Sequence, residues 1–202
     1  MNNSRGITIL ILLTVLGVGA TCLMQIGTVE RIEARRQANA NRTLLDVLPA
    51  DLYDNQPLAQ PVLMKPVPLT HSTLLGGYLA TRSGQPSAIL FRTQALGYEG
   101  TLELMIAIDT SGRLLGIKTL HQTETPGLGA AIADWPNAWL RTFNGRSLQS
   151  TLHSDWALKK EQGQFDQLAG ATVTSRAVLQ AVHDTLRYFD EHKAALTAGA
   201  TQ

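Results

Sequence analysis

A run of small residues and hydroxyl groups stands just before a long helical pattern near the C-terminus. Residues 165–178 read FDQLAGATVTSRAV, and the members that could do chemistry, or leave room for it, are Asp166, Gly170, Ala171, Thr172 and Thr174. Small neighbours leave the hydroxyl of Thr172 accessible, and a helix start offers unpaired N–H groups and a partial positive charge that favour a phosphate. The stretch predicts either such a phosphate-holding hydroxyl or an ordinary helix cap, in which Thr174 or Ser175 accepts the free amides.

A threonine nucleophile of a hydrolase is another use for the same hydroxyl. Such a nucleophile needs a neighbouring base, and the histidines that could supply one are His121, His153 and His183. No G-x-S-x-G elbow or other recognised spacing places any of them beside Thr172, and no H-x-x-x-H pattern indicates a metal site. We therefore expect solvated or structural histidines, no catalytic acid or base, and no bound metal.

A second stretch with turn-forming residues is ETPGLG, at residues 124–129, directly after a predicted strand that ends near His121. Pro126 and Gly127 form a turn signal, and two glycines let backbone amides approach a ligand where a β-carbon would intrude. The stretch fits both a tight strand-to-helix connection and a ligand-binding loop.

Alternating hydrophobicity predicts an antiparallel sheet that must position these two stretches. In residues 101–108 every second residue is Leu or Ile, a DTSG turn follows, and residues 114–120 run back. Residues 74–81 and 86–92 predict a preceding hairpin, and residues 156–159 a short further strand.

Helical patterns come after the sheet. Residues 130–143 place Trp135 and Trp139 four apart, although Pro136 predicts a break there. Residues 175–193 place one apolar stripe on a helix, as expected for packing on a sheet. The members of the stripe are Val178, Val182, Leu186 and Phe189. The fold class is therefore α+β, an antiparallel sheet with packed helices.

The N-terminal region predicts one transmembrane helix. Residues 7–26 read ITILILLTVLGVGATCLMQI without a formal charge, and about twenty helical residues span roughly 30 Å, the thickness of the bilayer hydrocarbon core. A cleaved signal peptide is the alternative, with Arg5 as a thin basic region. Thr21 before Cys22 fits a lipoprotein cleavage box poorly. As the one cysteine, Cys22 excludes an internal disulfide and a Cys-based zinc site.

The charges around this segment leave its orientation open. Arg5 precedes it, and four arginines follow it, namely Arg31, Arg35, Arg36 and Arg42. Taken literally, the positive-inside rule puts the bulk of the protein in the cytoplasm. The rule is a statistical bias, and a single N-terminal span can also carry a long domain across the membrane.

Composition shifts divide the rest of the chain. We expect a short tail at residues 1–6, the transmembrane helix at 7–26, a helical stalk at 27–48, an extended Pro-rich strap on the domain at 49–70, the main domain at 71–195 and a C-terminal tail at 196–202. The net charge of +1 and an aromatic content of 5% give no footprint for nucleic acid, which we exclude as a partner.

The two stretches together resemble a known family. Residues 166–172, DQLAGAT, are similar to the D-x-x-[S/T]-G-A-T motif of covalently flavinylated FMN-binding domains, and residues 124–129 are similar to their second motif, E-T-P-G-[L/M]-G. With the N-terminal span, the stalk and the length, the resemblance covers nearly the whole chain and is to the G subunits of the Rnf (Rsx) ion-translocating electron-transport complexes. The related C subunits of sodium-pumping NADH:quinone oxidoreductases usually have longer chains.

The resemblance implies a cofactor and its attachment. FMN would be joined by a phosphoester to Thr172. A separate flavin transferase would form this bond from FAD, with the help of magnesium, and would use Asp166 to recognise or align the acceptor. Thr174 is the second possible acceptor. The loop residues Glu124, Thr125, Pro126, Gly127, Leu128 and Gly129 would bind the isoalloxazine, with Leu128 against the ring. One departure is Ala169, which stands where the motif usually has Ser or Thr.

The resemblance also implies a function and a location. The chain would be an electron-carrying subunit of a redox-driven ion pump, anchored in the lipid of a bacterial inner membrane with its flavin domain on the periplasmic side. Its partners would be other membrane subunits and iron–sulfur subunits of the complex. The alternatives are an anchored periplasmic binding or regulatory domain without redox turnover and a membrane-tethered threonine hydrolase.

Overall fold

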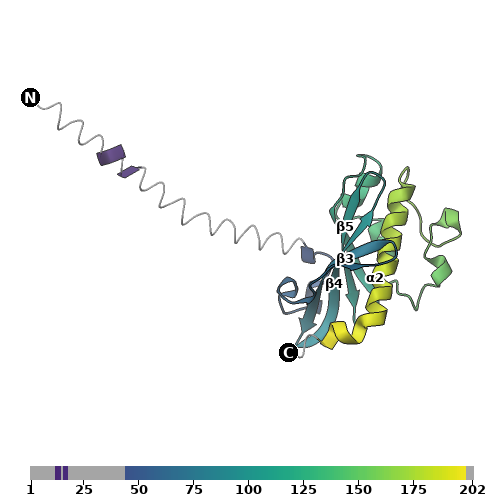
Figure 1. Ribbon diagram of the computed structural model, residues 1–202, viewed down its shortest axis with the longest axis horizontal. Coiled ribbons are helices and arrows are strands. Elements are labelled where there is room, and N and C mark those ends of the chain that lie inside the picture. The colour runs from purple at the N-terminus through teal and green to yellow at the C-terminus, as the bar shows by residue number, and fades with distance from the viewer. Residues whose placement is uncertain (1–11, 15, 18–43, 199–202) are drawn as a thin grey trace, which may run out of the picture. The chain divides into compact units, whose positions relative to one another are not determined.

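The computed structural model describes residues 12–14, 16–17 and 44–198 of the chain. The chain divides into two compact units, Met1–Thr43 and Leu44–Gln202, and the second is drawn in colour in Figure 1. Most of the predicted transmembrane helix and stalk lies outside the described residues. Among the residues that are described, no helix has both the length and the apolar character needed to span a bilayer.

An antiparallel sheet forms the centre of the second unit. Its long strands are β3 (Ser72–Arg82), β4 (Gln85–Leu96), β5 (Thr101–Asp109) and β6 (Leu114–His121), which pair in chain order. Both predicted hairpins are confirmed. Ser83 and Gly84 connect β3 to β4 with positive φ angles of 51° and 74°, as a two-residue hairpin turn of the primed type requires.

The predicted strand at residues 156–159 is wrong. Leu158 makes a single isolated bridge to Phe165, and the segment continues into a short 3-10 helix, η6 (Lys159–Glu161). The Pro-rich strap was expected to be extended, and it contains two 3-10 turns, η1 (Ala50–Leu52) and η2 (Pro57–Ala59). It also adds two short strands to the sheet, β1 (Pro61–Leu63) and β2 (Val67–Pro68), which both pair with β3. Prolines are tolerated there because an edge strand need not use every N–H group.

The C-terminal helix α2 (Thr172–Ala198) lies across one face of the sheet, as Figure 1 shows. The predicted stripe is confirmed. Its four side chains are at most 1% exposed and belong to one buried cluster with side chains of β3, β4 and β5, which includes Leu102, Leu104, Ile106 and Ile108 of β5. Burying each such side chain is worth about 1.5–3 kcal/mol, so this contact fixes the start of α2 relative to the sheet.

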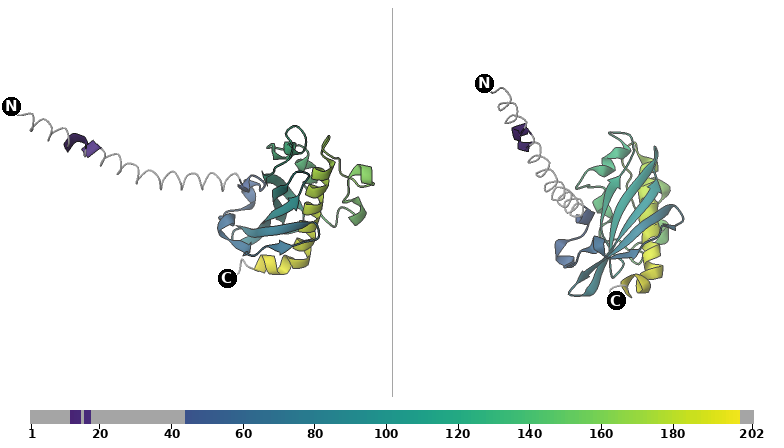
Figure 2. Two further views of the ribbon diagram at one scale, coloured as in Figure 1. Left: turned by 45° about the horizontal axis from the view of Figure 1, so that its top comes forward. Right: turned by 60° about the vertical axis from the view of Figure 1, so that its left-hand side comes forward.

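The opposite face of the sheet is covered by the chain that precedes the strands. Val47 and Leu48 are 3% and 4% exposed and pack with Leu90, Met105 and Ala107. The two further views in Figure 2 show this segment and α2 on opposite sides of the sheet. The main unit is thus a sheet covered on both faces.

The helical pattern predicted at residues 130–143 forms 3-10 helices, and the predicted break at Pro136 is confirmed. Two 3-10 helices occupy the segment, η3 (Gly129–Ala133) and η4 (Leu140–Phe143), and the Trp135–Pro136 peptide bond between them is cis. Proline cannot donate a helical hydrogen bond and its ring clashes with the preceding turn, which limits each piece to a short length. Another short 3-10 helix, η5 (His153–Asp155), precedes η6.

The predicted helix cap is also wrong. Helix α2 begins at Thr172, so Thr174 and Ser175 lie inside its first turn, where they are 1% and 0% exposed. The Ser175 hydroxyl donates to the Ala171 carbonyl at 2.8 Å and accepts the Leu168 N–H at 3.0 Å. These bonds hold the loop before the helix instead of capping the helix.

Candidate functional site

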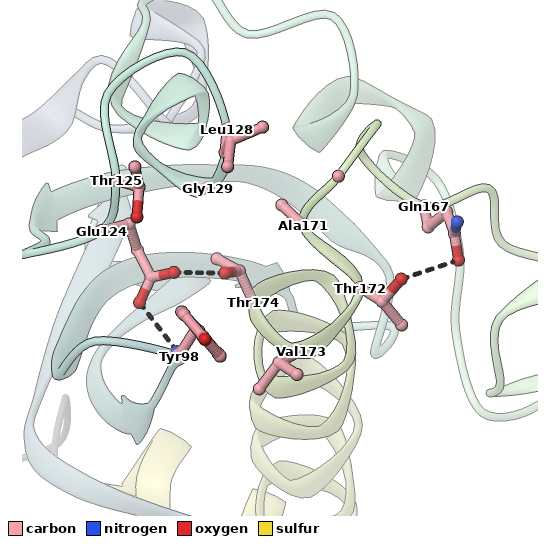
Figure 3. Close-up of a pocket in the computed structure, with 11 residues that line it drawn as sticks. Tyr98, Glu124, Thr125, Leu128, Gly129, Gln167, Ala171, Thr172, Val173 and Thr174 are labelled. Atoms are coloured by element: carbon pink, nitrogen blue, oxygen red, sulfur yellow. Dashed lines mark hydrogen bonds between the residues drawn. The ribbon is translucent and has the colours of Figure 1, made fainter.

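The two predicted motif stretches meet around one pocket beside the start of α2. Figure 3 shows it in close-up. Its volume is about 440 Å³, and its walls are formed by Tyr98, Glu124, Thr125, Leu128, Gly129, Gln167, Gly170, Ala171, Thr172, Val173 and Thr174. The loop after β6 supplies one wall, and the loop before α2 supplies the other. Residues far apart in the chain are therefore brought together by the packing of α2 on the sheet.

A buried carboxylate joins the two walls. Glu124 is 5% exposed, and its Oε1 accepts the backbone N–H groups of Tyr98 at 2.9 Å and Glu99 at 3.2 Å. Its Oε2 accepts the hydroxyl of Thr174, as Figure 3 shows. Burying a carboxyl group costs free energy unless hydrogen bonds replace those it made to water. Glu124 therefore fixes the β4–β5 connection and the first turn of α2 to the same point.

Two glycines allow the walls to approach one another. A Cβ at Gly129 would lie 2.5 Å from Glu124 Oε2 and 2.7 Å from Thr174 Oγ1. Gly170 has φ of +70°, and a Cβ there would lie 2.7 Å from Leu128 Cδ2. The sequence needs glycine at both positions, at the first for space and at the second for backbone conformation as well.

The two threonines at the start of α2 have opposite environments. Thr174 points toward Glu124, whereas Thr172 points toward Gln167 on the other side of the helix start, as Figure 3 shows. The Thr172 side chain is half-buried, and its Oγ1 donates to Gln167 Oε1 at 3.2 Å and accepts from Lys160 Nζ at 2.8 Å. Thr172 thus offers an accessible hydroxyl at the pocket edge, whereas the Thr174 hydroxyl is used internally.

A short 3-10 helix, η6, lies beside the loop that carries Thr172. Lys159 pairs with Asp166 at 2.7 Å, and Glu161 pairs with Arg176. The hydrogen bond from Arg176 lowers the pKa of Glu161 below its ordinary value, and the carboxylate raises the pKa of the guanidinium in return. These pairs hold η6 against the residues on both sides of Thr172.

Three predicted site residues do not line the pocket. Asp166 is exposed and paired with Lys159, while Pro126 and Gly127 form the outer part of the loop after β6. Gly127, with φ of +77°, lets this loop turn back so that Leu128 faces Gly170. Pro126 and Gly127 therefore shape the site without touching its cavity.

The structure adds pocket residues that sequence reasoning missed. Tyr98, Gln167 and Val173 all line it, and Tyr98 and Val173 are 71% and 43% exposed. Val173 could have been predicted as a contact residue, because it is apolar but lies outside the buried stripe of α2. Gln167 stands inside the motif at residues 166–172 and could have been included. Tyr98 is distant in sequence from both motifs and carried no signal.

The histidines do not contribute to the pocket. Its lining residues include no histidine, and His183 lies with its ring 5.4 Å from that of Trp156. Within the described residues no group of three or more His, Cys, Asp or Glu side chains could hold a metal ion. The pocket chemistry is that of hydroxyls, amides, one buried carboxylate and apolar side chains.

Comparison with known proteins identifies the family. An FMN-binding domain family matches residues 97–187, which include both motifs. The G subunit of the ion-translocating oxidoreductase complex of Pseudomonas aeruginosa is 42% identical over 96% of this chain and 92% of that protein. The chain belongs to the family of these G subunits. The corresponding protein of Shewanella loihica is 39% identical over 84% of this chain and 81% of its own length.

A solved structure is also similar to this member of the G-subunit family. The C subunit of a Na⁺-translocating NADH-quinone reductase from Parabacteroides distasonis is 26% identical and covers 62% of this chain and 63% of its own, with a TM-score of 0.47. The predicted family is thus confirmed by the comparisons with the two relatives from Pseudomonas and Shewanella.

The pocket of this family member fits FMN. A volume of about 440 Å³ lies in the usual range of roughly 300–1,000 Å³ for cofactor sites. Leu128, Val173 and Tyr98 give it apolar side chains suited to a flat aromatic ring, and the glycine positions leave backbone close to the cavity. The hydroxyl of Thr172 lies at its edge, where a phosphate would meet the start of α2.

Proposed function

We propose that the chain is an electron-transfer subunit of an ion-translocating oxidoreductase complex and that it carries FMN covalently on Thr172. The observation that carries the proposal is the meeting of both motifs around one pocket with an accessible threonine hydroxyl at its edge. Bound FMN supplies the ability to accept and pass on one or two electrons. Membership of the G-subunit family and the FMN-binding domain support this role.

The chain's own residues would hold the cofactor in place. Leu128 and Val173 would contact the flat faces of the ring, and the backbone around Gly129 would approach its polar edge. Glu124 keeps the two walls together through its bonds to Thr174 and to the β4–β5 connection. No side chain has to act as an acid or base for electron transfer.

The attachment reaction can be written for Thr172. Its Oγ1 forms a bond to the flavin-side phosphorus of FAD, the bond from that phosphorus to the bridging oxygen breaks, AMP leaves with that oxygen, and the hydroxyl proton is released. A flavin transferase would perform this step. The Thr174 hydroxyl is the poorer acceptor because it is 1% exposed and bonded to Glu124.

We further propose that residues 7–26 anchor the protein in the inner membrane and that its flavin domain faces the periplasm. The support is the uncharged segment of membrane-spanning length and the membrane-complex family to which the chain belongs. Partners would then be the membrane and iron–sulfur subunits of the complex. Membrane fractionation with protease added to intact spheroplasts tests this placement, since a periplasmic domain is digested without lysis.

Flavin fluorescence on a denaturing gel tests the function proposal. The wild-type chain from its native host is expected to give a fluorescent band, Thr172→Val to give none, and Thr174→Val to keep it. Flavin that is released on denaturation would instead indicate a non-covalent binding domain. A fluorescent band in Thr172→Val would refute the assignment of the acceptor.

A further inference from the structure

Three consecutive side chains of η6 each contact a different residue of the segment that carries Thr172. Lys159 Nζ lies 2.7 Å from Asp166 Oδ2, Lys160 Nζ lies 2.8 Å from Thr172 Oγ1, and Glu161 pairs with Arg176. Asp166 precedes Thr172 in the loop, and Arg176 is one helical turn after it. The outer two contacts therefore lie on both sides of the hydroxyl, and the middle side chain reaches it.

The middle contact differs from the other two in its charge. Lys159 and Arg176 are each paired with a carboxylate, whereas the Lys160 ammonium donates to a neutral hydroxyl. None of the ion pairs of the described residues involves Lys160, and its charge acts at longer range on the carboxylate of Glu161. Hydrogen bonds in which the donor or the acceptor is charged are about twice as strong as bonds between two neutral groups. Lys160 is thus the cation of this group that is placed to meet a negative charge formed at Thr172.

The hydroxyl itself is oriented by its two partners. Thr172 donates its proton to Gln167 Oε1 at 3.2 Å and accepts the Lys160 ammonium on its oxygen. Gln167 also lines the pocket, whereas Lys160 approaches from η6. The oxygen is therefore held between a hydrogen-bond acceptor and a cation, beside a cavity large enough for a flavin.

We propose that Lys160 is a positioning residue for flavin attachment. It holds the acceptor hydroxyl of Thr172 in place and supplies a positive charge beside the Thr172 oxygen. This inference rests on the proposed function. As the oxygen of Thr172 bonds to the flavin-side phosphorus of FAD, the bond from that phosphorus to the bridging oxygen breaks and AMP leaves with that oxygen. The hydroxyl proton passes to solvent, and a phosphodiester with a single negative charge remains on Thr172. The Lys160 ammonium stabilises the oxygen as its proton leaves and then pairs with the diester. Its flexible stem lets it move from Oγ1 to a phosphate oxygen on the neighbouring atom.

The test measures attachment directly and needs no electron-transfer assay. The full chain in detergent is incubated with flavin transferase, FAD and Mg²⁺, and initial rates are followed by gel fluorescence and by the mass of the peptide of residues 161–176, or of its equivalent in variants. Loss of a hydrogen bond from a charged donor predicts a rate about tenfold or more lower for Lys160→Met at saturating chain concentration. The half-saturating concentration of the chain should change less than about twofold, because the ammonium acts on the reacting oxygen.

Two further variants separate a charge effect from a structural one. Lys160→Arg keeps a cation and is expected to restore most of the rate. Glu161→Gln loosens η6 but keeps Lys160, and it should stay within about twofold of wild type, since a surface ion pair contributes little. Unfolding midpoints of the variants check that each one is folded.

Several results would overturn the inference. Wild-type rates in Lys160→Met would remove the role of Lys160 while leaving Thr172 as the acceptor. If Glu161→Gln slowed flavin attachment as much as Lys160→Met, or if Lys160→Arg did not restore the rate, the contact from Lys160 to Thr172 would have only a structural role. A wild-type chain that acquires no covalent flavin would overturn the proposed function itself, and this inference with it.

Discussion

Thr172 and Thr174 lie two residues apart in the first turn of α2, and their hydroxyls have opposite surroundings. Thr174 is 1% exposed and donates to the buried carboxylate of Glu124. Thr172 is half-buried at the pocket edge, between the Lys160 ammonium and the Gln167 side chain. Because successive helical residues are rotated by about 100°, positions two apart face nearly opposite directions. One hydroxyl therefore serves the fold and the other stays available for chemistry.

This difference shows how one helix start can have two roles. The Glu124 side anchors α2 to the β4–β5 connection through bonds to Tyr98, Glu99 and Thr174. The Thr172 side makes only contacts to exposed side chains, which can rearrange when the hydroxyl is modified. A rigid attachment point with an adaptable edge suits a covalently held cofactor.

The largest expected effect comes from removing the carboxylate that anchors Thr174. Glu124→Ala leaves two amide N–H groups and one buried hydroxyl without their acceptor, which should lower the free energy of unfolding by about 3 kcal/mol or more. Chemical unfolding followed by near-ultraviolet circular dichroism measures it. Glu191→Ala, at an exposed position on α2, serves as the control and should change stability by less than about 0.5 kcal/mol. A loss below about 1 kcal/mol in Glu124→Ala would contradict the anchoring role.

Matched valine substitutions at the two threonines sharpen the comparison. Thr174→Val leaves a buried oxygen of Glu124 without its donor and should cost about 1–2 kcal/mol of stability, while covalent flavin remains. Thr172→Val should change stability by less than about 0.5 kcal/mol, while covalent flavin is lost. Unfolding curves and gel fluorescence on the same preparations give both quantities. If one variant lost both stability and flavin, the division of roles would be wrong.

The smallest effect tests the ion pair beside Thr172. The bond from Arg176 lowers the pKa of Glu161 below its ordinary value of 4.5, so the folded state binds this proton less tightly than the unfolded state. The pair therefore stabilises the fold above pH 4.5, and its contribution disappears as the pH falls through the lowered pKa. Glu161→Gln should be less stable than wild type by under about 1 kcal/mol at pH 7, and this difference should shrink as the pH falls below 4.5. A difference in stability that does not change with pH would show that packing causes it and not the ion pair.

Local patterns predicted most of the sheet and the main helix. The alternation in residues 101–108 predicts a strand whose Leu and Ile side chains are buried, and these side chains are buried in the structure. The stripe of Val178, Val182 and Leu186 predicts a helix with one buried face, and these three side chains are also buried. The predictions were wrong where contacts between distant segments determine the local structure. Thr174 and Ser175 have the composition of a cap, but Glu124 and the Ala171 carbonyl take their hydroxyls instead. The segment of residues 130–143 was too interrupted at Pro136 to form an α-helix.

The candidate site divides in the same way. Both loops could be recognised as motifs in the sequence, because each needs a glycine. Gly129 leaves space for close neighbours, and Gly170 has a positive φ angle. Tyr98 and Lys160 could not be predicted as site residues. Tyr98 lies in the β4–β5 connection and Lys160 in η6, and no local sequence pattern connects either segment to Thr172. Such contacts arise only from the packing of α2 on the sheet.

Mass spectrometry of the tryptic peptide of residues 161–176, from chain purified from its native host, tests the central claim most directly. We predict a peptide heavier than its amino acids by one FMN less one water, with fragment ions that assign the addition to Thr172. A peptide with only its amino-acid mass, or an addition carried by Thr174, would contradict the account.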